Sequence, residues 1–345
     1  MGYFRYRCTH HVNQASIASE RLAESVPFVL APTLEQDRIV AEIEKQFTRL
    51  DAAVAALKRV QANLKRYRAA VLQAAVEGRL VSDADRLLSD ASPVRGRWTS
   101  APMEQIAAAI VDCPHSTPKW TTTGHICVRT TEFTPGFLDL SNVRHVSEQD
   151  YAARTRRLTP AAGDILYSRE GGILGVACLV PPSVRLCLGQ RMMLIRVKQL
   201  FMPEWVMHFL NSPVGRRWVR RLTGGSASPH VNVADVKQLV VPTPPAAEQR
   251  RIVAEIERRL SVVTELEADV RVSLRRAGRI RAGILRRAFE GRLVPQDSRD
   301  EPASALLERS TAERQATAAA ASSARRPPRR KRKRAHGVRP LLQES

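Results

Sequence analysis

The chain has few aromatic side chains and no long apolar run. Aromatic residues make up only 5% of a sequence that is 43% hydrophobic, which favours long Ala-, Leu- and Arg-rich helices beside one compact core. The longest apolar stretch, near Ile173–Val180, is far too short to span a bilayer. The first thirty residues also lack the apolar core and cleavage pattern of a secretory signal. We therefore expect a cytoplasmic protein that makes no contact with a membrane.

Cysteine usage argues against a disulfide framework. The five cysteines are odd in number and form no C-x-x-C pair, so we expect reduced thiols. Cys8 lies near His10 and His11, but this spacing matches no standard zinc pattern. We therefore predict no metal site.

Catalytic signatures are missing as well. None of the three Pro-Pro pairs is followed by an aromatic residue, as the catalytic loop of an amino-group methyltransferase requires, and no Gly-Lys-Ser/Thr triplet marks a P-loop. Asp164 and Glu170 could begin a nuclease carboxylate set, but Gly172 stands where its lysine is expected. We predict a chain with no catalytic residue and no bound cofactor.

Negative charge is scarce. Lys and Arg number 55 against 34 Asp and Glu, and the formal net charge of +21 implies a polyanionic partner, with nucleic acid first. Part of the charge is local, because residues 325–334 hold eight cations in ten positions, but +13 remains without them. An Ala- and Ser-rich run, Ala316–Ala324, precedes this stretch. We expect residues 295–345 to be a disordered basic tail. It either binds nucleic-acid phosphates without sequence specificity or is a solvated tail with no dedicated site.

One ten-residue sequence occurs twice with a single change. EQDRIVAEIE at Glu35–Glu44 returns as EQRRIVAEIE at Glu248–Glu257. The ungapped match extends over residues 35–81 and 248–294, with 20 identities in 47 positions. A short regular repeat would indicate a solenoid. Two distant copies indicate two equivalent arms that flank one globular unit.

Each copy has the pattern of a long helix. Apolar residues recur at alternating spacings of three and four, the period of a coiled-coil seam. The simpler alternative is two amphipathic helices buried in separate cores. Gly78 and Gly291 can adopt the left-handed conformation that ends a helix. We predict helices over residues 33–81 and 244–294, with a seam that includes Ile43, Phe47, Leu50, Leu57, Ile256, Leu260, Val263 and Leu274.

The segment between the arms is of a different kind. From Trp98 to Val241 the helical period mostly breaks, and short β-rich pieces alternate with Gly and Pro turns. We predict an α+β fold, with one mixed α/β domain over residues 98–243 that is reached through a linker at 82–97. Its expected strands and helices are His125–Thr130, Asp164–Tyr167, Gly175–Val180, Met192–Val197, Met202–Asn211 and Val214–Leu222.

Several stretches of this segment resemble a known family through their order. They are Ile106–Lys119, Arg154–Leu166, Ser168–Gly171, Gly189–Arg191, Thr223–Ser228 and the exit Pro242–Gln249. Each is weak alone. Between two copies of a helical arm, they resemble the DNA-specificity subunit of type I restriction-modification enzymes over most of the chain, residues 26–295.

The resemblance implies a target-recognition domain at residues 98–243 and an antiparallel coiled coil of the two conserved helices. It also implies that each helix docks one adenine methyltransferase (M) subunit and that a separate restriction/translocase (R) subunit cuts unmethylated DNA. Those partners would use S-adenosylmethionine, ATP and magnesium. This chain would be the non-catalytic subunit that binds double-stranded DNA.

The N-terminal region departs from the family pattern. A full-length member would have completed a first recognition domain before Thr33, whereas residues 1–32 look like a stub of one. Two interpretations stay open: a half-subunit that pairs with itself, or a truncated remnant. Two rival functions are a non-specific coiled-coil DNA-binding protein and a fragment of a fused enzyme whose catalytic domain is lost.

Candidate DNA contacts are loop residues that combine hydroxyl groups with nitrogen donors. Arginine suits guanine and glutamine suits adenine in the major groove. We expect Arg169, Gln190 and Arg191 to read bases, although the signatures around them could instead stabilise turns. The full set of DNA-contact candidates is Ser116, Thr117, Lys119, Arg154, Arg156, Arg157, Ser168, Arg169, Gln190, Arg191, Arg216, Arg217, Arg220, Arg221, Ser226, Ser228 and His230.

Overall fold

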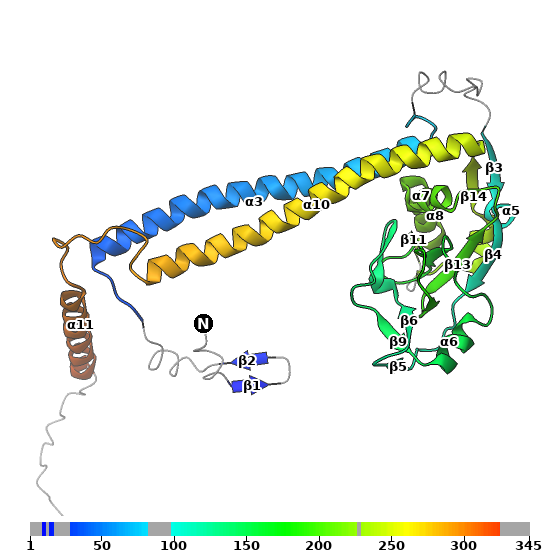
Figure 1. The fold of residues 1–345 in the computed structure, drawn as a ribbon. Helices are drawn as coiled ribbons and strands as arrows, with labels where there is room; N and C mark the ends of the chain where they lie inside the picture. Colours follow the sequence, from blue (N-terminus) through cyan, green and yellow to red (C-terminus); the bar gives the residue numbers. More distant parts are fainter. Residues whose placement is uncertain (1–8, 12–13, 17–27, 82–97, 226–228, 325–345) are drawn as a thin grey trace, which may run out of the picture. The chain divides into compact units, whose positions relative to one another are not determined.

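The computed structural model of this chain describes residues 9–11, 14–16, 28–81, 98–225 and 229–324. The chain divides into two compact units (Figure 1). Unit 1 combines residues 1–55 with 275–345, and unit 2 comprises residues 56–274. Both long helices contribute a segment to each unit, and the globular domain belongs to unit 2.

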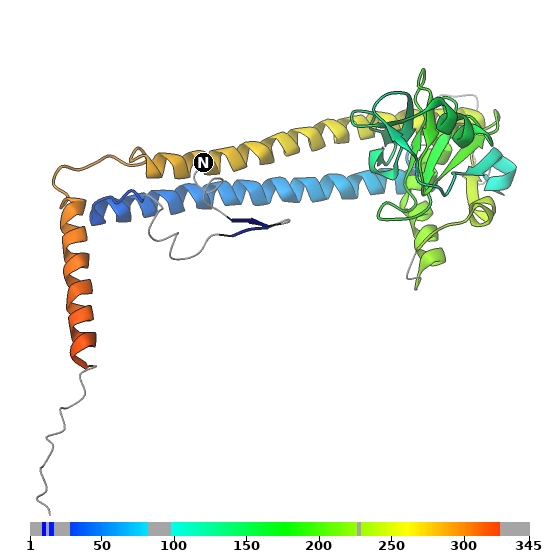
Figure 2. The same cartoon turned by 90° about the horizontal axis from the view of Figure 1, so that it is seen from below.

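The repeated arms are two helices of 44 residues each, α3 (Thr33–Val76) and α10 (Ala246–Phe289) (Figures 1 and 2). They end in the same way. Gly78 and Gly291 have φ angles of 70° and 64°, and the amide that follows each glycine donates a 2.8 Å hydrogen bond to a carbonyl of the last turn. This is the Schellman arrangement, and it confirms the predicted role of both glycines.

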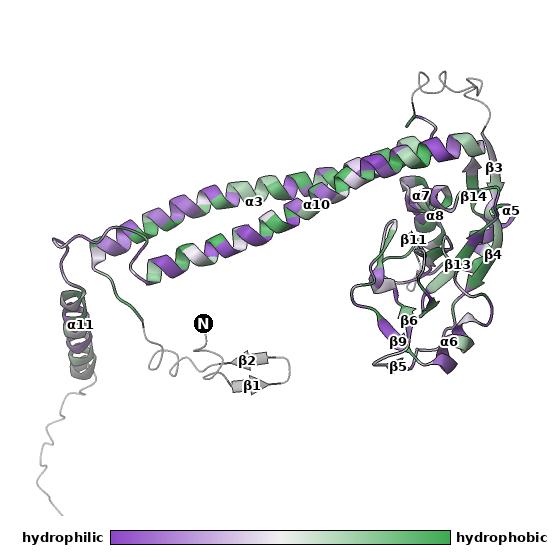
Figure 3. Ribbon diagram, in the orientation of Figure 1, coloured by the Kyte–Doolittle hydropathy of each residue, from purple (hydrophilic) through white to green (hydrophobic). Residues whose placement is uncertain are grey.

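Within each unit the two helix segments pack antiparallel. In unit 1 Arg281 of α10 forms a 2.6 Å ion pair with Asp51 of α3 and lies 4.4 Å from the ring centroid of Phe47. In unit 2 Arg68 of α3 lies 3.2 Å from Glu267 of α10. Apolar and polar positions alternate along both helices in Figure 3. Of the predicted seam residues, Ile256 and Val263 are buried, and the others are half-buried: Ile43, Phe47, Leu50, Leu57, Leu260 and Leu274. The supercoil itself stays a prediction.

The domain of unit 2 contains two four-stranded sheets. One is antiparallel, with the order β11-β10-β13-β4. The other has the order β12-β6-β9-β5, with β12 parallel to β6. The strands are β4 Ala107–Asp112, β5 Trp120–Thr121, β6 His125–Val128, β9 Arg144–Val146, β10 Ile165–Ser168, β11 Ala177–Leu179, β12 Leu186–Leu188 and β13 Met192–Val197.

Shorter elements complete the described structure. Strands β3 (Thr99–Pro102) and β14 (Val240–Thr243) pair where the chain enters and leaves the domain. The remaining elements of the domain are a hairpin of β7 (Phe133–Thr134) and β8 (Phe137–Leu138), a 3-10 helix at Thr130–Glu132, and the helices α5 Met103–Ile106, α6 Glu148–Thr155, α7 Pro203–Asn211, α8 Pro213–Thr223 and α9 Val233–Gln238.

The core of unit 2 joins the domain to the helix pair. Trp205 of α7 is fully buried and meets Trp98 edge to face, with the ring centroids 5.7 Å apart. Gln249 of α10 accepts a 3.0 Å hydrogen bond from the backbone amide of Met202, just before α7. Buried residues of α3, α7, α10 and β13 form one continuous apolar cluster. Helix α7 therefore fastens the domain onto the helices.

Most elements predicted inside the domain are confirmed. Strands β6, β10, β11 and β13 and helices α7 and α8 lie within about two residues of their expected positions. The sequence analysis missed strands β4, β5, β9 and β12, the β3–β14 and β7–β8 pairs, and helices α5, α6 and α9.

The predicted disorder of residues 295–345 is wrong for Ala303–Ala324, which form helix α11. Alanine is the best helix former, so an Ala-rich run can be helical without an apolar face to bury. Residues 325–345 and the linker 82–97 lie outside the described residues, as does most of the predicted stub at 1–32. Within that stub, β1 (Thr9–His11) pairs antiparallel with β2 (Gln14–Ser16). No helix of the described residues is long and apolar enough to cross a membrane.

Candidate nucleic-acid interface

Five loop segments meet at one edge of the domain, which we call the recognition edge. Cys113 N donates a 3.1 Å hydrogen bond to Met192 O, Arg169 N a 3.0 Å bond to Arg191 O, and Val231 N a 2.9 Å bond to Arg169 O. Segments far apart in sequence are thereby held side by side. The recognition edge consists of residues 112–119 after β4, 154–157 at the end of α6, 168–171 after β10, 189–191 before β13, and 230–232 before α9.

Arg169 is the central structural link of the recognition edge. Its side chain is buried and forms an ion pair with Asp112. Its Nε donates to Val231 O at 3.2 Å, and its Nη2 donates to Asn232 Oδ1 at 3.2 Å. Because the guanidinium donors are directed at protein acceptors, Arg169 holds three segments together. The contacts thus give Arg169 a structural role, and the expectation that it reads a base stays a prediction.

Arg154 and Ser168 also have structural roles. Arg154 is buried, and its Nη1 donates to Leu188 O at 3.1 Å while its Nη2 donates to Ser116 O at 2.8 Å. It therefore ties the loop after β4 to the end of β12. Ser168 is fully buried, and its hydroxyl donates to Glu170 O at 3.3 Å. The structure thus gives both residues roles inside the domain, and their expected contact with DNA stays a prediction.

The exposed side chains of the recognition edge remain candidates for DNA contact. Arg191 has a φ of 67°, an uncommon conformation for a residue with a side chain and one that is enriched at functional sites. Gln190 is half-buried and donates its side-chain amide to His115 O, which leaves its Oε1 as an acceptor. The exposed candidates are Ser116, Thr117, Lys119, Arg156, Arg157, Arg191 and His230.

The predicted arginines of α8 lie outside the five segments. Arg216 is half-buried and donates from Nη1 to Leu174 O at 2.6 Å, and burial lowers the pKa of its guanidinium. Arg217, Arg220 and Arg221 are exposed and stay candidates for phosphate contact. Ser226 and Ser228 lie outside the described residues.

Three residues that the sequence analysis did not assign to DNA contact support the recognition edge. Asp112 pairs with Arg169, and its Oδ2 lies 3.2 Å from Nε2 of His115. Asn232 accepts from Arg169 and caps α9 in a capping box with Asp235. The Asn-x-x-Asp spacing before α9 was the one available sequence signal for Asn232. No local pattern distinguishes Asp112 and His115 from ordinary surface residues.

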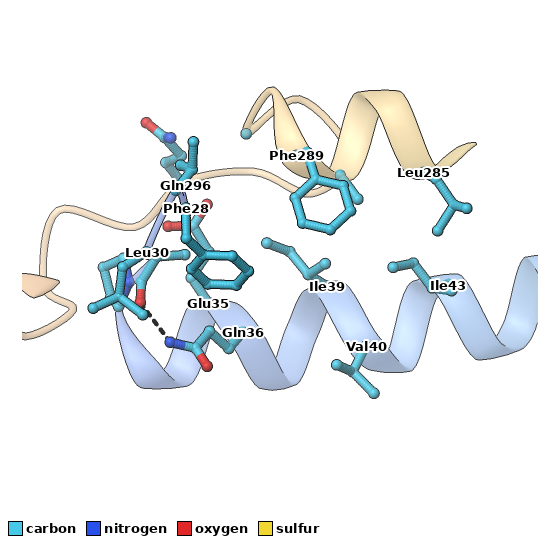
Figure 4. Close-up of a pocket in the computed structure, with 15 residues that line it drawn as sticks. Phe28, Leu30, Glu35, Gln36, Ile39, Val40, Ile43, Leu285, Phe289 and Gln296 are labelled. Carbon is cyan, nitrogen blue, oxygen red and sulfur yellow. Dashed lines mark hydrogen bonds between the residues drawn. The ribbon is translucent and has the colours of Figure 1, made fainter. Parts of the chain in front are cut away.

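A second candidate surface lies in unit 1 (Figure 4). A pocket of about 370 Å³ is lined largely by apolar side chains from the start of α3 and the end of α10. Figure 4 shows Phe28 and Phe289 beside Ile39, with Val40 and Leu285 nearby. The rings of Phe28 and Phe289 meet edge to face at 6.5 Å. Because the arms are repeats, each helical position here has an equivalent 213 residues away in unit 2.

Equivalent positions of the two units differ in exposure. Val40 in unit 1 is 52% exposed, whereas its equivalent Val253 in unit 2 is 4% exposed because the domain covers it. Gln36 and Gln249 each donate a 2.8 Å hydrogen bond to the carbonyl five residues earlier. Gln249 also accepts from Met202, whereas no donor among the described residues reaches Oε1 of Gln36. At Val40 and Gln36, unit 1 therefore lacks, among the described residues, the contacts that the domain makes at the equivalent positions of unit 2.

The fold and the recognition edge define a class of protein: an α/β domain with a loop-built edge, carried by an antiparallel helix pair. The sequence profile described as "Type I restriction modification DNA specificity domain" matches residues 133–275. The predicted resemblance to the DNA-specificity subunits of type I restriction-modification enzymes is thereby confirmed.

Two bacterial specificity subunits and one solved structure are similar to the chain. The EcoKI specificity subunit of Escherichia coli K12 is 27% identical over 303 residues, which cover 83% of this chain and 64% of that subunit. The EcoBI specificity subunit of Escherichia coli is 26% identical over 319 residues, covering 87% of this chain and 67% of that subunit. The chain thus spans about two thirds of these relatives. A solved structure from work on the complex assembly and conformational transition of the type I R-M system has the same fold, with a TM-score of 0.55. The two sequences are 18% identical, and the match covers 76% of this chain and 61% of the other.

Proposed function

We propose that this chain is a non-catalytic, DNA-sequence-recognition subunit of a type I restriction-modification complex. The recognition edge carries the proposal, because five loops of a specificity-type domain present hydroxyl, amide and guanidinium groups together. Such groups suit the base edges and phosphates of duplex DNA. The net charge of +21 supports a polyanionic partner.

We further propose that α3 and α10 dock the M subunits and that an R subunit joins the assembly in the cytoplasm. Those subunits would use S-adenosylmethionine, ATP and magnesium. The support comes from large apolar residues that stay exposed on the helices of unit 2: Val60, Tyr67, Val262 and Leu266. A large contiguous apolar patch on a surface is typical of a protein-binding site, and we propose that these residues, two on each helix, contribute to one.

The pocket of unit 1 supports a self-paired half-subunit. Val40 and Phe289 of this pocket are exposed apolar residues, whereas their equivalents in unit 2 are covered by the domain. This difference favours a protein partner that binds at the pocket. Light scattering tests this proposal: the wild-type chain should be dimeric, and a Val40→Lys, Phe289→Lys variant should be monomeric. A wild-type monomer at all concentrations would favour the truncated remnant.

The experiment that tests the function is methylation mapping. The chain is expressed with its neighbouring M subunit in methylation-free cells, and methyladenine is located across the genome. An interrupted palindrome would mean a self-paired half-subunit. A two-part, non-palindromic motif would mean that another polypeptide supplies the second half-site.

Two outcomes would contradict the proposed function. If the M subunit methylates DNA beside another specificity subunit but not beside this one, the chain is a remnant. If the purified chain binds all duplexes equally and directs no methylation, the non-specific coiled-coil alternative is favoured.

A further inference from the structure

One face of α10 in unit 1 carries a ring of arginines around a glycine. Side chains three and four positions apart are neighbours on a helix surface. Gly283 therefore has Arg279 one turn before it and Arg286 and Arg287 one turn after it, and Arg276 lies two turns before it on the same face. All four arginines are exposed. We call these four residues the arginine ring.

The charge of the ring is not neutralised on its own helix. The last 20 residues of α10, positions 270–289, contain no Asp or Glu. Within the described part of the chain, Arg276, Arg279 and Arg286 make no side-chain hydrogen bond or ion pair, and Arg287 donates to the carbonyl of Arg292 at 3.1 Å. Glu290, which follows the helix, is paired with Arg292 at 2.6 Å.

Packing inside the molecule does not explain the glycine. Gly is the least favourable helix residue apart from Pro. A Cβ atom added at Gly283 would meet no heavy atom within 4 Å, so no described neighbour requires its absence. Gly283 is half-buried, and its missing side chain leaves room beside the helix for a group from outside the chain.

Most of the ring is not shared by the two arms. The position equivalent to Gly283 in α3 is Ala70. Those equivalent to Arg276, Arg286 and Arg287 are Asn63, Gln73 and Ala74, and Arg279 alone has an arginine, Arg66, at the equivalent position. A requirement common to both helices, such as the seam between them, therefore does not account for the ring.

We propose that the arginine ring binds a backbone phosphate of duplex DNA, with one phosphate group over Gly283. This inference rests on the proposed DNA-binding function. It proposes a DNA contact in unit 1, besides those proposed for the recognition edge in unit 2. Guanidinium groups donate two parallel hydrogen bonds to a phosphate, and the glycine lets the phosphate oxygens approach the helix. Ile280 is the apolar residue that borders the ring, whereas a docking helix would need a row of such anchors.

The salt dependence of DNA binding tests the ring. Affinity of the full chain for a labelled duplex of random sequence is measured by fluorescence anisotropy over a range of salt concentrations. Each phosphate contact contributes about 0.9 to the slope of log affinity against log salt. Because the ring is proposed to bind one phosphate, the variant Arg276→Gln, Arg279→Gln, Arg286→Gln should lower the slope by about 0.9.

A matched control removes three charges elsewhere in unit 1. Arg299, Arg309 and Arg314 are exposed and lie outside the ring, so their Gln variant should keep nearly the full slope. An equal loss of slope in both triple variants would overturn the proposal, because net charge alone would then explain the effect. An unchanged slope in the ring variant, together with loss of M-subunit binding, would assign the ring to a protein contact and also overturn it.

A second variant tests the geometry without changing the charge. Gly283→Leu keeps all four arginines and has a higher helix propensity, so loss of folding is not expected. It should weaken binding to the random duplex at least tenfold, because the side chain fills the phosphate position. Unchanged affinity would contradict a ring centred on the glycine. If the wild-type chain binds no duplex at any salt, the proposed function itself fails, whereas normal binding with an unaltered slope in the ring variant refutes the ring alone.

Discussion

Replacing Arg169 by Met should lower the free energy of unfolding of the domain in unit 2. It should not change which DNA bases the domain prefers. The substitution leaves the carboxylate of Asp112 with His115 but without its guanidinium partner, and it removes the side-chain donor to the carbonyl of Val231. Removal of one member of a buried ion pair destabilises by about 3–5 kcal/mol. The Asp112 side chain is 18% exposed, so water solvates part of the freed charge, and we expect about 3 kcal/mol, at the lower end of that range.

Urea unfolding followed by tryptophan fluorescence measures this effect. The signal reports the domain, because all four tryptophans lie within residues 98–243: Trp98, Trp120, Trp205 and Trp218. With a denaturant slope of about 2 kcal/mol/M, the unfolding midpoint should fall by about 1.5 M. The control is Arg156→Met on the same edge, which removes an exposed side chain and should change stability by no more than about 0.5 kcal/mol. An unchanged midpoint combined with altered base preference would refute the structural role of Arg169 and support the expectation that it reads a base.

Other substitutions test the helix ends and the buried histidine. Gly78→Ala places a Cβ 3.3 Å from the Trp98 ring at a φ of 70°, so it should destabilise unit 2 by about 1–2 kcal/mol in a urea melt. Gly291→Ala meets the flexible end of Gln296 instead; it should cost about 1 kcal/mol, and an effect larger than that of Gly78→Ala would contradict the packing argument. Burial, assisted by the charge of Arg68, lowers the pKa of His208 to about 4. The unfolded chain, with a His pKa of about 6.5, therefore takes up the proton first as the pH falls, and about 2 kcal/mol of stability should be lost between pH 6.5 and 5. His208→Leu should remove that part of the pH dependence, and an unaltered pH profile would show that His208 is accessible to protons in the folded state.

The sequence predicted the parts of the fold that have a strong local signal. The repeated arms follow from their period, and their ends follow from Gly78 and Gly291. Strands β10 and β13 were found because they are continuous apolar runs that are buried in the sheet. The missed strand β12 has three residues, and the β3–β14 pair contains prolines, so neither has the alternation that marks a longer strand. Helix α11 was missed because composition was weighed above helix propensity.

The candidate site was predicted as a set of segments but not residue by residue. The segments that the resemblance selected do converge at the recognition edge. Arg154 and Arg169 were nevertheless assigned to DNA contact, because an arginine in a loop usually faces solvent. Their burial depends on carbonyl and carboxylate acceptors that reach them from other segments, such as Ser116 O and Asp112. No local pattern in the sequence carries that information.

The two arms show how far a repeated sequence determines a repeated structure. Helix ends and the hydrogen bonds of Gln36 and Gln249 recur because they depend on residues within a few positions of each other. Burial does not recur: Phe289 is 60% exposed, whereas its equivalent Val76 is 8% exposed. Local interactions thus make the two helices alike, whereas the domain that packs on the unit 2 segments of both helices makes burial differ between equivalent positions. An apolar surface that no domain among the described residues covers is costly in water unless a partner covers it. The oligomeric state and the methylation motif therefore both test whether this chain pairs with itself.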